Sequence, residues 1–347
     1  MRAEAKKPDV GGQAVIEGVM MRSPNSYVVV CRLQDGRIAV RESPWRSVWD
    51  RLGFLRRPFL RGAVVLFESL HNGLDALSFA ANQQVESEAA AAGEEAPEMN
   101  SGAVAGTLIV SMVMAFAIFG ALPHLLAFLA GEGLGVDIKD GTSVAFHAID
   151  GLIKAALFLT YLWGISRLED IRRVFMYHGA EHKSIATYEA GEELIVANAR
   201  QHSRFHPRCG TSFIFMVILT SMLVFSVVFP MIPKLVESTI LNQVLYVFIK
   251  IPLMFPIAGL AYELQRLSAK APNNPIVKVL IWPGLALQRI TTVEPDDDML
   301  EVALLSLRKV LWREAAGAEA AVDKAGEVEY FDSFEAAASH AALPAAA

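Results

Sequence analysis

The sequence is poor in cysteine and has no excess of basic residues. Its 347 residues include two cysteines, Cys31 and Cys209, which cannot build a disulfide framework, so we expect two reduced thiols. The formal net charge is −6 and no stretch combines basic with aromatic residues, which excludes nucleic acid as an expected partner. The opening residues lack an apolar core of signal-peptide length, so we expect the chain's own spans to direct insertion.

Charge is also scarce in four long runs. Hydrophobic residues make up 53% of the chain and charged residues 20%, and the mean hydropathy is +0.36. Soluble domains average about 45–50% apolar and about 25% charged residues. The four runs are residues 104–129, 144–165, 212–232 and 240–262, each long enough to cross a hydrocarbon core of about 30 Å. The sequence therefore predicts a mainly α-helical, polytopic membrane protein with about four transmembrane helices in residues 104–262.

The N-terminal region, residues 1–85, is too polar to lie in the membrane and is expected in the cytoplasm. The β-branched run Tyr27–Leu33 and the alternating run Arg37–Glu42 enclose an Asp-Gly turn, which predicts a small β-hairpin. From Pro58 to about Gln84, apolar residues recur at helical spacing but several charged residues are interspersed. This pattern predicts an amphipathic helix that packs on the protein or lies at the membrane surface.

Three other segments are expected outside the membrane. Residues 86–103 form an acidic, Ala-rich linker, and the similar tail at residues 314–347 is expected to be disordered. Residues 263–313 form a C-terminal cytoplasmic segment. Within this segment, Met299–Arg313 has the pattern of an amphipathic surface helix.

The basic residues of the loops indicate the orientation. Loops 131–143 and 233–239 have one such residue each, Lys139 and Lys234, whereas the motif-rich loop 166–211 has seven. The positive-inside rule therefore places loop 166–211 and both termini in the cytoplasm. Because Lys250 and two prolines interrupt the fourth run, a re-entrant fourth segment is the alternative.

The segment YHGAEHK, residues 177–183, gathers the densest set of reactive side chains. His178 and His182 are four residues apart, so on a helix both can reach one divalent metal ion, for which zinc is the expected identity. Glu181 would lie beside the ion as a general base, and H-x-x-E-H is the order of the inverted zinc-peptidase motif. The alternative is a structural hydrogen-bond network of histidines at the membrane surface.

A catalytic zinc site needs a third protein ligand and an open position. The favoured candidates are His206 and Cys209 in RFHPRCG, because this segment precedes the third span and consecutive spans usually form an antiparallel hairpin. Other residues of the loop that could serve are Glu189, Glu192, Glu193 and His202. The simpler interpretation of His206 and Cys209 is a loop histidine and a buried thiol.

Further charged residues could complete this site. Glu17 and Arg22 lie in a Gly-rich segment that could fold against the same face and supply a catalytic carboxylate and a cation, or form an ion pair that fixes a tight loop. Lys183, as a further catalytic candidate, and Arg208 could bind an anionic lipid or a peptide carboxylate, although such residues often contact lipid headgroups without a catalytic role.

Charged residues inside the spans are a separate case. Asp150 and Lys250 lie within predicted spans, where ionisable residues are functional candidates by default. A mutual structural pair, or a Lys250 side chain that reaches the interface, explains them equally well. His71, His124 and His147 are isolated in the sequence, and we expect them to be satisfied or interfacial.

Several linked segments resemble a known family. They include GGQAVIEGVMMR, RRVFMYHGAEHKSIATYEAGEEL, NARQHSRFHPRCGTSF and WPGLALQRITTVEP, and the resemblance runs from about Gly11 to Arg313. The chain is similar to the bacterial membrane proteins of domain of unknown function 1385, the YqhQ-like group. The resemblance implies a metal-dependent enzyme of the bacterial cytoplasmic (inner) membrane and supplies no substrate. Its motif positions correspond here to Glu17, Arg22, His178, Glu181, His182, Lys183, His206, Arg208 and Cys209.

Three functions are compatible with these patterns. The first is a metal-dependent membrane hydrolase with its site at the cytoplasmic face. The second is a non-enzymatic assembly, insertion or scaffold factor whose polar cluster binds a partner or lipid headgroups. The third, a transporter that uses Asp150 and Lys250, lacks the paired discontinuous helices of many transporters. Membrane lipid is the expected partner, with another membrane protein or a second copy of the chain as further candidates.

Overall fold

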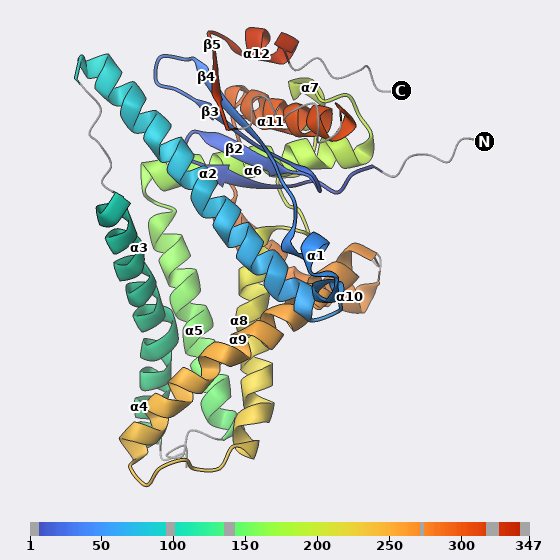
Figure 1. The fold of residues 1–347 in the computed structure, drawn as a ribbon. Coiled ribbons are helices and arrows are strands. Elements are labelled where there is room, and N and C mark those ends of the chain that lie inside the picture. The colour runs from blue at the N-terminus through green and yellow to red at the C-terminus, as the bar shows by residue number, and fades with distance from the viewer. Residues whose placement is uncertain (1–6, 95–100, 135–142, 271–273, 317–325, 341–347) are drawn as a thin grey trace.

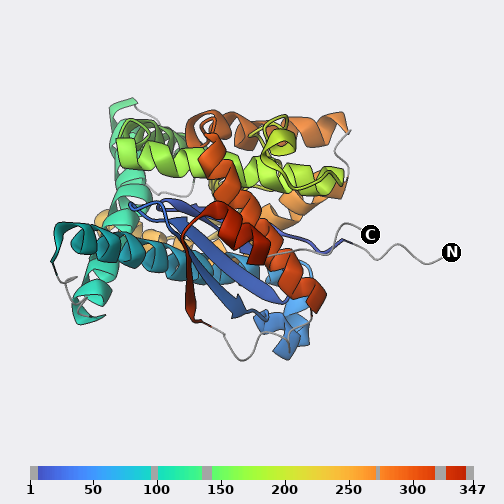
Figure 2. The ribbon, with the colours of Figure 1, turned by 90° about the horizontal axis from the view of Figure 1, so that it is seen from above.

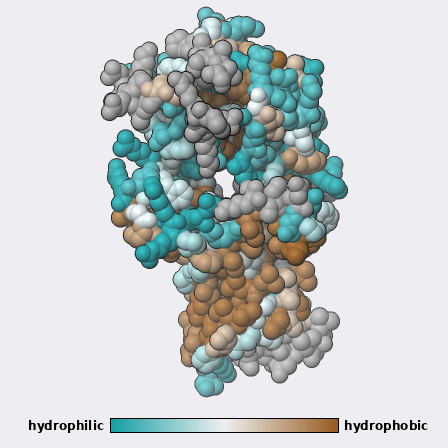
Figure 3. Space-filling model, turned by 90° about the vertical axis from the view of Figure 1, so that its right-hand side faces the viewer, coloured by the Kyte–Doolittle hydropathy of each residue, from teal (hydrophilic) through white to brown (hydrophobic). Residues whose placement is uncertain are grey.

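A computed structural model describes residues 7–94, 101–134, 143–270, 274–316 and 326–340. Its elements form two regions, a bundle of long apolar helices and a sheet with helices on both faces at one end of that bundle (Figure 1). Figure 3 shows the same division on the face in view, where apolar residues gather on the bundle and polar residues on the end that contains the sheet. Lys139 lies outside the described residues.

The prediction of four membrane-spanning helices is confirmed by length and composition. The candidate spans are Ile109–Gly131, Val144–Ile165, Gly210–Met231 and Thr239–Leu267. They are formed by α3 (Ser101–Phe116), the π-helical turn η2 (Ala117–Ala121), α4 (Leu122–Leu134), α5 (Val144–Ile165), α8 (Gly210–Val228), the short η3 (Phe229–Met231) and α9 (Thr239–Lys270). Because α9 continues through Pro252 and Pro256, the fourth segment is one long helix rather than a re-entrant one.

A five-stranded antiparallel sheet forms the centre of the polar region. Its strands follow chain order: β1 (Gly11–Val15), β2 (Gly18–Arg22), β3 (Ser26–Arg32), β4 (Ile38–Pro44) and β5 (Val328–Phe331). The predicted hairpin is confirmed as β3 and β4, in which Val30 lies opposite Val40. No strands were predicted in the Gly-rich segment, but it forms β1 and β2. Glu17 lies in the turn between these strands, at a φ of +49°.

The two faces of the sheet pack against different helices because side chains alternate along each strand. Val28 and Val30 face the core shared with α6 (Glu169–Ala190) and α11 (Asp297–Ala316). Val29 and Cys31 face the opposite core, which contains Phe79 of α2 (Leu60–Ala92). Seen from above, α11 and α6 lie over one side of the strands (Figure 2). The sheet is therefore the middle layer of three.

The long helix α2 links the sheet to the bundle, and its Gly62 packs against Gly259 of α9. The predicted helix is present, but its apolar stripe is exposed: Phe67, Leu70, Leu74 and Leu77 are each at least 40% accessible. Small and polar residues such as Gly73 and Asn72 occupy the packed face instead. A short helix α1 (Val48–Arg51) and the turn η1 (Gly53–Arg56) precede α2.

Two predictions about the polar segments were wrong, those for the tail and for Met299–Arg313. The linker 86–103 is helical at both ends, because α2 extends to Ala92 and α3 begins at Ser101, while residues 95–100 are not described. The tail 314–347 is ordered where it is described, since β5 pairs with β4 and α12 (Phe334–His340) follows. The helix α11, expected at the surface, is instead central to the core between α6 and the sheet, where Val302, Leu305 and Leu307 are fully buried.

Candidate metal centre

The motif YHGAEHK lies on α6, where the spans meet the sheet. The helix α5 of the second span ends at Ile165 and α6 begins at Glu169, and the chain changes direction between them (Figure 1). The two remaining helices of this region are α7 (Val196–Ala199) and α10 (Pro275–Thr291). From Phe175 to Ile185, α6 is almost entirely buried, which places the motif inside the protein.

Both histidines of the motif are oriented by backbone carbonyl groups. His178 Nδ1 lies 2.8 Å from the carbonyl oxygen of Thr291, and His182 Nδ1 lies 2.6 Å from that of Arg204. Because a carbonyl oxygen only accepts hydrogen bonds, each Nδ1 must donate, which leaves each Nε2 as the nitrogen available to a metal. Metal-binding histidines commonly have such a partner on the other ring nitrogen.

Cys209 completes a three-atom cluster with these nitrogens. Its Sγ lies 3.2 Å from His178 Nε2, and the three potential ligand atoms of His178, His182 and Cys209 all lie within 4.8 Å of one another. The Nε2 atom of His182 is buried and has no hydrogen-bond partner among the described residues. Two imidazoles and a thiolate are good zinc ligands, and three protein ligands leave a position open. The residues therefore fit a divalent metal, with zinc as the best match.

The electrostatics of the cluster favour a deprotonated thiol. Burial alone would raise the pKa of the Cys209 thiol, but the charge and hydrogen bond of His178, with a smaller effect of His182, hold it well below its usual range. Burial would also lower the pKa of His178, yet the thiolate raises it to about 9. The cluster is thus already polarised toward the thiolate, the form in which cysteine binds metals.

Glu181 lies beside the cluster and is covered by the sheet. A Cβ atom on Gly12 of β1 would come within 2.7 Å of Glu181 Cγ, so glycine at this position allows the strand to pack directly on the glutamate. Burial raises the pKa of Glu181, although the charges of His182 and His178 partly oppose this effect. The Glu181 carboxylate is therefore a buried group next to the candidate ligands.

His206 was expected as a ligand together with Cys209, but of these two only Cys209 belongs to the three-atom cluster. The His206 ring lies beside His182, with ring centroids 5.6 Å apart. Its Nε2 faces Glu189 Oε2 at 3.4 Å, and its Nδ1 accepts a hydrogen bond from the Arg208 N–H at 3.3 Å. His206 therefore packs against the cluster without contributing to it.

The other charged candidates are engaged in ion pairs elsewhere. Lys183 pairs with Glu294 and donates to the Arg200 carbonyl at 3.0 Å. Arg208 pairs with Glu189, also outside the cluster.

The two N-terminal candidates likewise have partners outside the cluster. Glu17 pairs with Arg173 and accepts a 3.3 Å hydrogen bond from Tyr177. Arg22 faces Glu68 at 3.9 Å and lies over the Trp45 ring. Glu17 contacts α6, as expected of the Gly-rich segment, whereas Arg22 contacts α2.

Gln288 of α10 is a supporting residue that the sequence analysis missed. Its side chain accepts from the His206 N–H at 2.8 Å and donates to the His206 carbonyl at 2.7 Å and to Ser212 Oγ at 2.8 Å. It is fully buried and so fixes the segment that carries Cys209. A glutamine in an apolar helix has no distinctive local sequence pattern. Its role becomes visible only in the structure, where its side chain pairs with the backbone N–H and carbonyl groups of His206.

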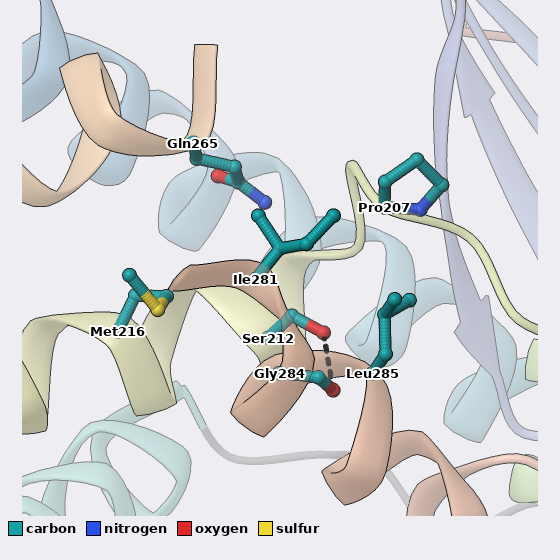
Figure 4. Close-up of a pocket in the computed structure, with 7 residues that line it drawn as sticks. All are labelled: Pro207, Ser212, Met216, Gln265, Ile281, Gly284 and Leu285. Atoms are coloured by element: carbon teal, nitrogen blue, oxygen red, sulfur yellow. Dashed lines mark hydrogen bonds between the residues drawn. The ribbon is translucent and has the colours of Figure 1, made fainter. Parts of the chain in front are cut away.

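Figure 4 shows a narrow crevice on the far side of this segment, between α8, α9 and α10. The Ser212 hydroxyl donates to the Gly284 carbonyl at 2.9 Å. Gln265 and Pro207 also line the crevice. Its volume is about 10 Å³, which is room for no more than one water molecule. The crevice is therefore a packing feature and not a substrate cavity.

The intramembrane charges form a second, separate cluster. Lys250 Nζ donates to Asp150 Oδ2 at 2.5 Å and to His124 Nδ1 at 2.9 Å, and His124 Nε2 then donates to Gln243 Oε1 at 2.8 Å. Lys154 also lies 3.6 Å from Asp150. The expectation that His124 is a satisfied histidine is therefore confirmed, with partners that come from another span.

Comparison with known proteins assigns the family. A family model described as Protein of unknown function (DUF1385) matches residues 57–313. The chain belongs to this family. It is 34% identical over 316 residues to the "Uncharacterized protein YqhQ" of Bacillus subtilis (strain 168), covering 89% of this chain and 94% of that protein. No solved structure matches the chain. The family match includes α6 and the Cys209 segment, so the candidate metal centre lies within it.

Proposed function

We propose that this chain is a metal-dependent integral membrane hydrolase. The observation that carries the proposal is the convergence of His178 Nε2, His182 Nε2 and Cys209 Sγ within 4.8 Å, with both histidines held by carbonyl groups. His182 Nε2 is buried and has no hydrogen-bond partner among the described residues. An unsatisfied buried polar atom costs about 1–3 kcal/mol, and a bound cation removes that cost.

A divalent metal at this position, for which we favour zinc, would act as a Lewis acid and make water more acidic. The residues of the chain provide the remaining functions. Glu181 is the nearest carboxylate to the histidines on α6 and is positioned to accept a proton from attacking water. Gly12 and the first strand cover it, which keeps bulk solvent from the carboxylate. Lys183, Arg208, Glu17 and Arg22 serve in this proposal as structural ion pairs.

The proposed site lies at the cytoplasmic face of the bacterial inner membrane. The support is the basic loop between the second and third spans, which contains α6 and Cys209. By the positive-inside rule this loop is cytoplasmic, and an even number of spans then places both termini on the same side. The sheet, built from both ends of the chain, fits this arrangement because β4 and β5 pair directly.

A specific observation favours a second candidate, a cysteine nucleophile. The 3.2 Å contact between Cys209 Sγ and His178 Nε2, with the lowered thiol pKa, is also the arrangement of an activated thiol. In that mechanism Cys209 attacks the substrate and His178 carries the proton. The two candidates differ in what protects the thiol: a metal shields Cys209 from alkylation until a chelator removes it, whereas a nucleophile reacts without chelation.

The proposal is tested with the purified full chain and a panel of ester, amide and phosphoester substrates, with and without zinc. We expect zinc-dependent hydrolysis that Glu181→Gln abolishes while zinc content stays unchanged. Glu189→Gln, which removes a carboxylate paired with Arg208, is the matched control and should retain activity. Activity that survives Glu181→Gln would contradict its role, and a folded wild type that takes up no zinc would favour the assembly or scaffold function.

A further inference from the structure

A second feature at the membrane boundary is an open hollow lined by three arginines. Its volume is about 450 Å³, and it lies between the end of α5, the start of α6 and the end of α10. Arg167, Arg172 and Arg289 line it together with Trp163 and Ser166, and no acidic residue is part of its described lining. The hollow is therefore large enough for a small ligand and strongly positive.

The three guanidinium groups are available for a ligand. Among the described residues, none of them has a carboxylate within ion-pair distance, in contrast to Arg173 and Arg208, which pair with Glu17 and Glu189. Arg167 lies over the Trp163 ring at 4.8 Å, which orients its planar group. Arginine favours phosphate because its planar donors match two phosphate oxygens at once.

The location of the hollow indicates a lipid rather than a dissolved ion. Trp163 lies two residues before the end of the second span and is 54% exposed, as is typical of aromatic residues at the headgroup level of a membrane. Arg167 follows the same span by two residues. A ligand in the hollow would have its phosphate at the arginines and its apolar tail beside α5, which is the arrangement of an anionic phospholipid.

The hollow also adjoins the candidate metal centre. Val293 lines it, and the backbone of the same segment packs on α6: the Val293 N–H donates to the Phe175 carbonyl, and Thr291 accepts from His178. Along α6, Arg172 and His178 are six residues apart, or about 9 Å at the helical rise of 1.5 Å. A headgroup bound at Arg172 would thus lie less than two helical turns along α6 from His178.

We infer that this hollow binds the phosphate-bearing headgroup of an anionic membrane lipid. That such a lipid is also the substrate class of the His178, His182 and Cys209 centre rests on the proposed function. The binding site itself stands on the three unpaired arginines and their position at the end of a span, independently of any metal.

The test is binding of tail-labelled phosphatidylglycerol to the detergent-purified full chain, with phosphatidylcholine as the zwitterionic comparison. We expect preferential binding of phosphatidylglycerol, weakened about tenfold or more when Arg167, Arg172 and Arg289 are all replaced by glutamine. The matched control replaces Arg46, Arg51 and Arg57 by glutamine. These arginines are exposed in the segment between β4 and α2 and do not line the hollow. This control should change binding less than twofold.

Two further arms separate the possible failures. The lipid site would be overturned if the variant lacking Arg167, Arg172 and Arg289 bound phosphatidylglycerol as well as the wild type, or if the control variant lost as much binding. It would also be overturned if inorganic phosphate displaced the labelled lipid as effectively as phosphatidylglycerol does. Arg172→Lys keeps the charge but not the planar group and should weaken binding only in part. The variant with His178→Ala and His182→Ala should lose metal and keep lipid binding, so failure of the proposed function leaves a result distinct from failure of the lipid site.

Discussion

The His178 centre lies where the spans meet the sheet, and the Asp150–Lys250 cluster lies inside the bundle. Both contain histidines that pack against residues from other parts of the chain. In the first, each Nδ1 is held by a backbone carbonyl and three ligand atoms converge on one point. In the second, a cation and a carboxylate neutralise each other, and His124 links the pair to Gln243.

The difference indicates different roles. The His178 centre has unused bonding capacity directed inward, including His182 Nε2, which suits a ligand that is added after folding. The Asp150–Lys250 cluster pairs its charges internally and does not bring three ligand atoms together, although Asp150 Oδ1 and both ring nitrogens of the neighbouring His147 lack hydrogen-bond partners among the described residues. We therefore interpret the first as a functional centre and the second chiefly as a connection between spans.

The largest expected effect is on the second cluster. Lys250→Met leaves the buried Asp150 carboxylate with Lys154, 3.6 Å away, as its remaining cation, and breaking a buried pair costs up to about 3–5 kcal/mol. We expect a correspondingly lower stability in detergent, measured by thermal or denaturant unfolding, with zinc binding retained by the protein that remains folded. Adding Asp150→Asn to Lys250→Met should restore much of the lost stability.

Lys234→Met is the control, because Lys234 and its partner Glu237 are both exposed in the loop between η3 and α9. An intact stability of Lys250→Met would show that the cluster is not a connection between spans. That result would favour the alternative that Asp150 and Lys250 serve in transport.

A smaller effect is expected from Gln288→Ala. This change removes the side chain that pairs with both backbone groups of His206, and unsatisfied buried groups cost about 1–3 kcal/mol. Because the same segment carries Cys209, zinc affinity should fall by about 10–100-fold, as for other residues that orient metal ligands. Competition with a zinc-binding dye measures this affinity, and Gln201→Ala at an exposed position should leave it unchanged. Unchanged zinc affinity in Gln288→Ala would separate Cys209 from the centre.

The smallest effect is expected from Gly12→Ala, which adds a methyl group where Glu181 and Met21 already lie within 2.8 Å. Overpacking of this kind costs about 1–3 kcal/mol, and flexible side chains that give way reduce the cost. We expect a modest loss of stability, unchanged zinc content and loss of hydrolysis, because Glu181 is displaced. Gly11→Ala, one residue earlier with open space around it, should behave as wild type. Equal behaviour of the two variants would contradict the packing of β1 on Glu181.

Features set by local geometry could be predicted from the sequence. The four spans follow from length and scarcity of charge, and the His178–His182 pair follows from a four-residue spacing on one helix. Cys209 could be placed near the pair because the second and third spans are consecutive. The hairpin of β3 and β4 followed from alternation around an Asp-Gly turn.

Features set by contacts between distant residues could not be predicted. Strand β5 is four residues long in an Ala-rich tail, and it forms because β4 offers an open edge almost 300 residues away along the chain. The contacts that hold His206 come from Gln288 and Glu189, neither of which has a recognisable pattern. His124 and Lys250, 126 residues apart, meet only after the bundle has formed.

The most direct test of the account is elemental analysis of the detergent-purified protein after zinc loading and removal of free metal. The account predicts about one zinc per chain in the wild type. Zinc should be lost in His178→Ala with His182→Ala and in Cys209→Ala, and retained in His202→Ala, where a histidine paired with Glu192 lies outside the centre. A folded wild type without bound metal, or zinc retained in the double histidine variant, would contradict the central claim.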